Sequence, residues 1–364
     1  MQLAPERKSV IKYSRTGNRE RTNFKARQSR IQLASQEYIF TTISHLRKTQ
    51  GGTNKVKISV LGATGSVGAP VAFYIAVTGL ADELLMVGGK RQNVLEHHAL
   101  DIQTAASLNN VTVKHGGYED LPGTDVLINV AGAHIPLNLD RRKKLQEQTR
   151  FIQEIAREIR MYCPDAIVLT GVNPIDALNY ATYLAGGFER RQLIGYSIND
   201  TIRFKETLAK ELQEEAARID GLVIGEHGGT QVPLFSSVKV GNESVDMTAS
   251  AKQRIRSGMF DMIKKFESLK AGRTAGWTCA VGFAAMVKAI VEDQKVVLPC
   301  SVVLDGEYGQ HNISMSVPVV LGRDGVNEIL EYELTDGERQ GLTVTVETLQ
   351  SDAAVVRDTL LASG

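Results

Sequence analysis

The stretch that decides the fold is KVKISVLGATGSVGAPVAFYIAVTGL, residues 55–80. Apolar and polar side chains alternate over residues 56–60, which is the pattern of a strand. Glycines then recur at every third position over residues 62–68, and apolar residues follow at helical spacing over 71–76. A strand, a glycine-rich turn and a helix in this order predict a unit that binds a dinucleotide.

The glycine-rich turn is a candidate phosphate site. Glycines let the backbone approach a pyrophosphate, which then lies on the N-terminus of the helix, where amide donors and the helix dipole favour negative charge. The spacing is G-x-x-G-x-x-G rather than the commoner G-x-G-x-x-G. A tight turn alone also requires glycine, so the flanking strand and helix carry the prediction. The candidate cofactor-binding residues here are Gly62, Gly65, Ser66, Val67 and Gly68.

A second stretch, LLMVGGKRQN, residues 84–93, bears on the choice of cofactor. Gly88 lies twenty residues after Gly68, where an NAD-binding unit usually places an acid on the ribose 2′-hydroxyl. Glycine removes the charge that would repel a 2′-phosphate, and Lys90 and Arg91 offer charge-assisted hydrogen bonds to a dianion. These residues favour NADP over NAD, and an ordinary solvated loop is the alternative for the two cations.

Further strands and helices alternate along the chain. Apolar runs at 83–87, 125–132 and 166–174 predict strands, and a charged amphipathic helix is expected near 142–161. Alternation of this kind predicts a parallel sheet that helices cover on both faces. We therefore expect an α/β protein with a doubly wound Rossmann sheet followed by an α+β catalytic domain.

The first 54 residues differ in charge from the rest. Residues 1–54 hold 11 Lys or Arg against three Glu, a surplus of +8, and since the whole chain carries +1 the remaining 310 residues carry −7. Three interpretations remain open. The extension is an organelle transit peptide, a solvated tail that contacts acidic partners, or the result of a start codon assigned upstream of the true one. We expect a basic extension over 1–54, the dinucleotide-binding domain over 55–197 and the catalytic domain over 198–364.

The composition excludes several classes of protein. Hydrophobic residues make up 43% and charged residues 23%, which is ordinary for a globular protein. No run of 18 apolar residues exists, so we expect no membrane span. The three cysteines fit neither a disulfide framework nor a zinc site, and no metal is expected. Because the extension lacks interleaved aromatic residues, nucleic acid is not an expected partner. The expected location is the cytoplasm, or an organelle matrix if the extension is a transit peptide.

Residues 221–234, GLVIGEHGGTQVPL, place His227 in a Gly-Gly bend after an apolar strand. A histidine has a pKa near neutral pH, which suits general acid–base catalysis. The alternative is that His227 only makes a buried structural hydrogen bond. Asp200 and Arg203 are three residues apart near the start of a predicted helix, so they share one face. Asp200 would support an imidazolium and Arg203 would hold a carboxylate through two hydrogen bonds. A surface ion pair is the alternative for both.

From about residue 55 to residue 354, the chain resembles the lactate/malate dehydrogenase family. The motifs GATGSVG, GVNP, NDTIRF, IGEHGGTQVPL and GRDG occur in the order and spacing of that family. The combination of GATGSVG, VGGKR and GEHG is most similar to the archaeal-type malate dehydrogenases that use NADP. The resemblance implies hydride transfer between NADP or NAD and a small L-2-hydroxy acid, by a homodimer or homotetramer.

The resemblance also implies roles for single residues. It makes His227 the proton donor to the substrate carbonyl and Asp200 its partner, and it makes Arg203 the ligand of the C1 carboxylate. Arg141 matches the arginine that polarises the reacting carbonyl. Asn173 matches the asparagine near the nicotinamide and the substrate hydroxyl, with an expected cis bond to the following proline. Thr274, within the stretch KAGRTAGW, would line the side-chain pocket.

Ile135 is the main departure from the family pattern. It lies six residues before Arg141, where malate enzymes carry an arginine for the distal carboxylate and lactate enzymes usually carry glutamine. A buried carboxylate without a partner is costly, so Ile135 favours lactate or an apolar 2-hydroxy acid. For malate, one of the nearby basic residues His134, Arg142 and Lys143 would have to replace the missing arginine. Whole-chain similarity still favours malate.

A nucleotide-binding protein without turnover is the remaining alternative. Such a protein would be expected to lack one or more of the four residues matched to catalysis and substrate binding. The chain retains all of them: His227, Asp200, Arg141 and Arg203. The sequence therefore favours an enzyme.

Overall fold

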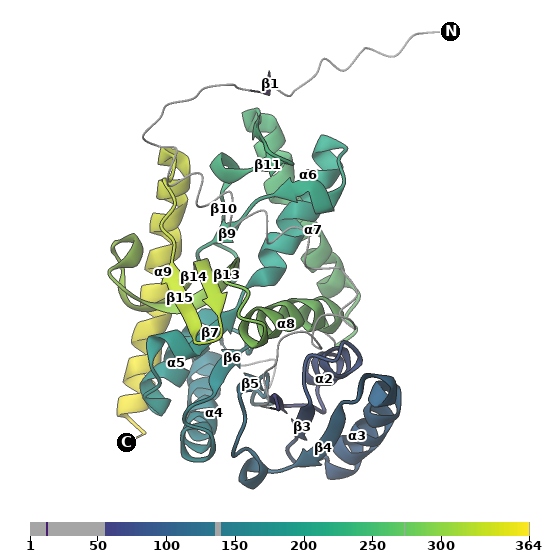
Figure 1. The fold of residues 1–364 in the computed structure, drawn as a ribbon. Coiled ribbons are helices and arrows are strands. Elements are labelled where there is room, and N and C mark those ends of the chain that lie inside the picture. The colour runs from purple at the N-terminus through teal and green to yellow at the C-terminus, as the bar shows by residue number, and fades with distance from the viewer. Residues whose placement is uncertain (1–11, 14–54, 135–139, 273, 364) are drawn as a thin grey trace.

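The computed structural model describes residues 12–13, 55–134, 140–272 and 274–363. One large sheet, to which nine strands of these ranges belong, is its main feature (Figure 1). Its parallel strands are β2 (Lys57–Leu61), β3 (Glu83–Val87), β4 (Thr112–Gly116), β5 (Val126–Asn129), β6 (Ile167–Thr170) and β7 (Leu193–Tyr196). They lie in the order β4-β3-β2-β5-β6-β7, so the chain starts in the middle, builds one side and then returns to build the other.

Helices cover both faces of these parallel strands. The connecting helices are α2 (Gly68–Val77), α3 (Gln92–Ala106), α4 (Arg141–Tyr162) and α5 (Ile175–Gly186). In β2, Ile58 and Val60 pack in one hydrophobic core with residues of α2 and α3, whereas Leu61 packs in a second core with residues of α4. Every residue of β5, β6 and β7 is buried, as expected for strands covered on both sides. The doubly wound Rossmann sheet expected from the sequence is confirmed.

The second half of the chain extends the same sheet with antiparallel strands. These are β13 (Val296–Asp305), β14 (His311–Gly322) and β15 (Gly325–Ile329). β13 pairs with β7, with Cys300 opposite Tyr196 and Ser301 opposite Gly195, and β14 and β15 follow outward. The sheet therefore crosses the position between residues 197 and 198 that the sequence suggested as a domain boundary.

Helices and short strands complete the α+β half. The helices are α6 (Ile198–Leu212), α7 (Ala249–Ser268), α8 (Gly276–Val291) and α9 (Asp336–Leu361). The short strands are β8 (Ile219–Asp220), β9 (Val223–Ile224), β10 (Val232–Pro233), β11 (Lys239–Val240) and β12 (Glu243–Asp246). Short 3-10 helices are η3 (Ser107–Asn109), η4 (Tyr118–Asp120), η5 (Arg190–Gln192), η6 (Ala216–Arg218), η7 (Phe235–Ser237) and η8 (Glu307–Gly309).

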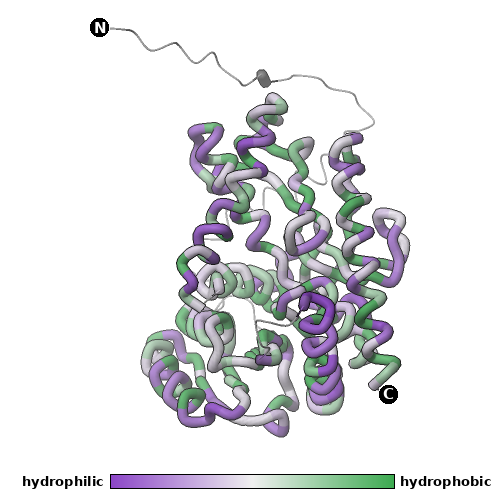
Figure 2. The backbone as a smooth tube through the Cα atoms, turned by 180° about the vertical axis from the view of Figure 1, so that it is seen from behind, coloured by the Kyte–Doolittle hydropathy of each residue, from purple (hydrophilic) through white to green (hydrophobic). Residues whose placement is uncertain are grey.

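The long helix α9 packs along α4 and α5 (Figure 1). It buries Leu342, Val346, Leu349 and Ala353, which recur at helical spacing along one face. Figure 2 shows the resulting alternation of hydrophobic and hydrophilic stretches along this C-terminal helix. Because α9 contacts α4, it brings its polar residues close to the start of α4.

Of the basic extension, the structure describes only β1 (Lys12–Tyr13), which pairs antiparallel with β12. The rest of the extension, residues 1–11 and 14–54, lies outside the described residues. None of the helices in the described ranges is both long and apolar enough to cross a membrane.

Candidate active site

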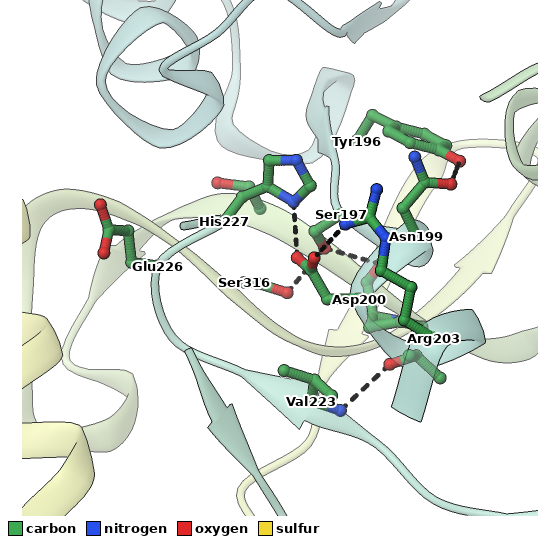
Figure 3. Close-up of polar contacts among 12 residues, drawn as sticks. Tyr196, Ser197, Asn199, Asp200, Arg203, Val223, Glu226, His227 and Ser316 are labelled. Atoms are coloured by element: carbon green, nitrogen blue, oxygen red, sulfur yellow. Dashed lines mark hydrogen bonds and ion pairs between the residues drawn. The ribbon is translucent and has the colours of Figure 1, made fainter. Parts of the chain in front are cut away.

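His227, Asp200 and Arg203 meet in one buried cluster (Figure 3). The imidazole Nδ1 of His227 lies 2.5 Å from Oδ2 of Asp200. The other carboxylate oxygen, Oδ1, accepts a hydrogen bond of 3.1 Å from Nη1 of Arg203. The side chains of Asp200 and His227 are only 6% and 13% exposed. The structure thus brings together three residues that the sequence assigned to one site.

The start of α6 positions Asp200 and Arg203. The helix buries Phe204 and Leu208 in a hydrophobic cluster, and Asp200 in its first turn contacts His227. Just before the helix, the Ser197 hydroxyl donates to the Pro299 carbonyl and lies 2.6 Å from the Ser316 hydroxyl, which ties the helix start to β13 and β14. Asp200 lies in the first turn, where the helix dipole favours a negative charge.

Several hydrogen bonds fix the bend that carries His227. Its backbone N–H donates to Oδ2 of Asp176 over 2.7 Å. Gly225, with a φ of +95°, forms an antiparallel bridge with Ser316. The Glu226 carboxylate accepts hydrogen bonds from the backbone N–H and the hydroxyl of Thr230. The catalytic candidate therefore lies on a short segment whose backbone is held from several sides.

The surroundings of His227 favour its protonated form. Burial lowers the pKa of the imidazole, but the nearby carboxylates of Asp200 and Asp176 outweigh burial and raise the pKa above its ordinary value. Arg203 opposes the carboxylates to a smaller extent. A histidine held in this way can carry a proton at neutral pH and give it to a bound oxygen atom.

Arg141 lies at the first position of α4, and its side chain is 65% exposed. Its Nη2 lies 2.8 Å from Oδ2 of Asp352 in α9 and 3.7 Å from Oε1 of Glu226. Glu226 is the chain neighbour of His227, and in Figure 3 it points away from the Asp200–Arg203 pair. Arg141 is therefore close to the catalytic bend but paired with carboxylates, and its action on a reacting carbonyl stays a prediction.

Of three further candidates, the structure describes Asn173 and Thr274. Asn173 is exposed at the end of the β6 loop, and its bond to Pro174 is cis, as the sequence predicted. Thr274 is exposed just before α8, where its carbonyl accepts a hydrogen bond from the N–H of Gly276. Ile135 lies outside the described residues. The roles proposed for these three side chains remain untested by the geometry.

The glycine turn has the geometry that a bound pyrophosphate requires. Gly62 has a φ of +83°, and a Cβ there would lie 2.8 Å from the backbone N of Ala131. At Gly68 a Cβ would lie 2.2 Å from the Gly62 carbonyl oxygen, and at Gly65 it would lie 3.2 Å from the same oxygen. Val67, the N-cap of α2, provides no side-chain cap, and the first turn of α2 contains no acid. The turn is therefore narrow and free of negative side chains, which fits a phosphate group.

The Gly88–Arg91 loop lies beside this turn at the end of β3. The backbone N–H groups of Gly62 and Ala63 both donate to the Val87 carbonyl, which joins the two segments. Arg91 Nη2 donates to the Thr64 carbonyl over 2.9 Å, and Lys90 is exposed. Both cations of the loop are thus close to the position where the adenosine ribose is expected.

Sequence reasoning missed Asp176, Glu226 and Asp352. Asp176 follows the GVNP motif and has the pattern of an ordinary acid in the first turn of a helix. Its partner His227 is 51 residues away, and Asp352 is 211 residues from Arg141, so no local pattern indicates these contacts. Within the described ranges, no group of three or more His, Cys, Asp or Glu residues is placed to hold a metal ion.

Comparison with known proteins gives matches over both halves. Residues 56–195 match the lactate/malate dehydrogenase NAD binding domain, and residues 199–358 match the lactate/malate dehydrogenase alpha/beta C-terminal domain. A malate dehydrogenase of Bacillus subtilis is 34% identical over 311 residues, which covers 82% of this chain and 98% of the relative.

Solved structures of such enzymes have the same fold. The malate dehydrogenase of Cryptosporidium parvum aligns with a TM-score of 0.77 and 28% identity, covering 84% of this chain and 100% of that one. The lactate dehydrogenase of the same organism, complexed with lactic acid and nicotinamide adenine dinucleotide, aligns with a TM-score of 0.77 and 27% identity, covering 84% and 99%.

Proposed function

Because the chain belongs to the lactate/malate dehydrogenase family, we propose that it is a malate dehydrogenase that prefers NADP(H) to NAD(H). Its relatives make it an oxidoreductase of 2-hydroxy acids, malate or lactate, with a nicotinamide cofactor. The observation that carries the proposal is the buried contact of His227 with Asp200 and of Asp200 with Arg203.

The residues of the glycine turn fit the cofactor. The turn has no side chains at Gly62, Gly65 and Gly68, so a pyrophosphate could approach its backbone closely. The N-terminus of α2 lies next to these glycines, and this segment would therefore hold the pyrophosphate. When bound, the nicotinamide supplies or accepts the hydride. Asn173 follows β6 at the same edge of the sheet and would lie between the nicotinamide and the substrate.

His227 would supply the proton in the reduction of a 2-oxo acid. Since Asp200 engages Nδ1, Nε2 is the nitrogen left to face the substrate oxygen. Protonated His227 gives the Nε2 proton to that oxygen as negative charge develops on it, and the Asp200 carboxylate stabilises the imidazolium beforehand. In the oxidation of a 2-hydroxy acid, neutral His227 removes the hydroxyl proton.

The two arginines would bind and polarise the substrate. Arg203 uses Nη1 on Asp200, and its guanidinium has further donors for the C1 carboxylate. Arg141 would stabilise the reacting oxygen, which requires its guanidinium to leave Asp352. The two cations beside the substrate would stabilise the negative charge that develops on the reacting oxygen.

The preference for NADP(H) rests on the loop beside the glycine turn. Gly88 leaves no carboxylate to repel a 2′-phosphate, and Arg91 is held against the Thr64 carbonyl with further N–H groups available. Lys90 is exposed in the same loop. Lys90 and Arg91 would bind the 2′-phosphate of NADP, which is a dianion. NAD has an uncharged hydroxyl at the same position.

Malate is proposed on the similarity of the whole chain, and Ile135 favours the alternative of lactate or another apolar 2-hydroxy acid. Three exposed basic residues flank the segment that contains Ile135, namely His134, Arg142 and Lys143. For malate to be the substrate, one of them must bind the distal carboxylate, because burial without a partner is costly.

Assembly as a homodimer or homotetramer, in the cytoplasm or an organelle matrix, is part of the same proposal. Native mass measurement tests the assembly, and localisation of the protein tests the compartment.

An initial-rate grid tests the proposal. It crosses NADPH and NADH with oxaloacetate, pyruvate and 2-oxoisocaproate, on the purified full chain. Fast oxaloacetate reduction with NADPH is the expected result. Turnover restricted to pyruvate or 2-oxoisocaproate would make the enzyme a lactate-type or apolar 2-hydroxyacid dehydrogenase. A preference for NADH would contradict the role given to Lys90 and Arg91. Nucleotide binding without any turnover would leave a non-catalytic nucleotide-binding protein.

A further inference from the structure

A second buried carboxylate contacts His227, and it belongs to α5 rather than to α6. Oδ2 of Asp176 accepts the backbone N–H of His227 over 2.7 Å, and Oδ1 accepts the hydroxyl of Ser301 over 2.5 Å. Asp176 itself is only 3% exposed. A carboxylate buried to this degree requires donors on both oxygens, and here one of the two donors is the catalytic candidate itself.

A network of buried polar groups holds Asp176 in place. The Ser301 hydroxyl lies 2.9 Å from the Ser314 hydroxyl, which in turn accepts a hydrogen bond from Asn179. Ser301 packs closely against Gly195, where a Cβ would lie 2.8 Å from the Ser301 Cβ. Strands β7, β13 and β14 therefore fix the serine that orients the carboxylate, and the carboxylate fixes the backbone of His227.

The charges that face His227 come from three elements. Asp200 and Arg203 belong to α6, Asp176 belongs to α5, and Glu226 precedes His227 in the bend. Arg141 approaches Glu226 from α4 at 3.7 Å. Asp200 and Arg203 form an ion pair, so their opposite effects on the protonation of His227 partly cancel. The carboxylate of Asp176 adds a further negative charge that favours the protonated imidazole.

We propose that Asp176 is a positioning residue for the proposed reaction: its carboxylate holds the His227 backbone and favours the protonated imidazole. This inference rests on the proposed function, because it assigns a purpose to the proton that His227 carries. Burial raises the pKa of Asp176 to about 6, against the hydrogen bonds from Ser301 and from the His227 N–H. Asp176 is therefore mostly ionised above that pH, and its charge is one of the causes that raise the pKa of His227.

The Asp176→Asn variant removes the charge and keeps the shape. Its amide oxygen can still accept the His227 N–H, and its amide nitrogen can donate to Ser301, whose hydroxyl can rotate. The first measurement is the NMR titration of His227 in the protein without substrate, assigned by the signal lost in His227→Asn. We expect the midpoint of His227 to fall by about one pH unit, as for the loss of one nearby carboxylate.

Two further variants make the test specific. Ser301→Ala keeps the carboxylate but removes a hydrogen bond that stabilises it, so a smaller fall of the His227 midpoint is expected, and this milder change also serves if Asp176→Asn does not fold. Asp305→Asn removes the carboxylate that faces the exposed His311 at 3.0 Å, and it should leave the His227 midpoint unchanged. A folded Asp176→Asn protein, or a folded Ser301→Ala protein, with a wild-type His227 midpoint would overturn the proposal.

Kinetics separate this proposal from the proposed function. With the 2-oxo acid that the wild type reduces, Asp176→Asn should lower kcat about tenfold at a pH well above the wild-type His227 midpoint, because there a fall of one unit leaves about a tenth as much protonated His227. KM should change little, since Arg203 still binds the carboxylate. An unchanged kcat together with a lowered His227 midpoint would also overturn the proposal. If the wild type reduces no 2-oxo acid, the proposed function fails, while the NMR titration still decides whether Asp176 acts on His227.

Discussion

At the scale of single residues, His227 accounts for most of the chemistry that the site supports. Its imidazole is buried, and it has a carboxylate on Nδ1 and another on its backbone N–H. Burial alone would favour the neutral ring, so the raised pKa of His227 shows that the carboxylates win over burial. These contacts favour the protonated ring, which is the form that the proposed reduction of a 2-oxo acid needs.

This charge balance predicts opposite pH profiles for the two directions of the reaction. Because the folded-state pKa of His227 is raised above 6.5, reduction of the 2-oxo acid should persist above pH 6.5 and decline as pH rises through the folded pKa. Oxidation of the 2-hydroxy acid needs neutral His227 and should increase through the same pH range. The stability that His227 contributes follows the reduction profile, being present below pH 6.5 and lost above the folded pKa. Profiles of kcat/KM in both directions measure this.

The exposed His311 provides the control for these profiles. A His311→Asn variant should leave both profiles in place, because His311 is paired with Asp305 at the surface. A reduction profile centred at or below pH 6.5 would contradict the account.

At the scale of elements, the turn between β2 and α2 depends on close backbone approach. A Cβ at Gly68 would lie 2.2 Å from the Gly62 carbonyl oxygen, which is backbone and cannot move aside easily. Gly68→Ala should therefore destabilise the fold by roughly 1–3 kcal/mol and weaken NADPH binding by at least tenfold. Thermal melting and fluorescence titration measure the two effects. Gly337→Ala is the matched control, because nothing lies within 4 Å of its Cβ position. Equal behaviour of the two variants would refute this explanation of the turn.

The contact between α4 and α9 gives a second prediction at this scale. Arg141 pairs with Asp352, but its side chain is 65% exposed, so the pair should contribute less than about 1 kcal/mol to stability. Arg141→Ala should lower kcat about 100-fold or more, as expected for loss of a group that stabilises developing charge, with little change in melting temperature. Asp352→Asn, which removes the partner but keeps the arginine, should retain activity. Loss of activity in Asp352→Asn but not in Arg141→Ala would reverse the roles given to the two residues.

Whether a contact could be predicted from the sequence depends on how far apart its two residues are along the chain. The parallel strands and α4 follow from local apolar patterns. The contact of Asp200 with His227, 27 positions apart, was instead predicted from the motifs and the family resemblance, and the structure brings these residues together with Arg203. The contact of Asp176 with His227 and that of Arg141 with Asp352 were not predicted, because no periodicity links residues 51 or 211 positions apart. The pairing of β7 with β13 was missed for the same reason.

At the scale of the whole molecule, one sheet connects the two halves of the chain. β7 ends the parallel part, and β13 continues the sheet with Ser301 opposite Gly195. This pairing places Ser301 beneath α5 and so links the dinucleotide-binding half to the bend of His227 through Asp176. The glycine turn after β2 and the cluster of His227, Asp200 and Arg203 are thus connected through one sheet.

The proposed reaction is the reduction of a 2-oxo acid, in which NADPH supplies the hydride and His227 supplies the proton. The most direct measurement is NADPH consumption by the wild type and by His227→Asn on mixing with oxaloacetate, with NADPH affinity measured in parallel by fluorescence. The account predicts rapid consumption by the wild type, consumption slower by roughly a thousandfold or more in the variant, and similar NADPH affinity in both. Equal rates in the two proteins, or no consumption by a wild type that binds NADPH, would contradict it.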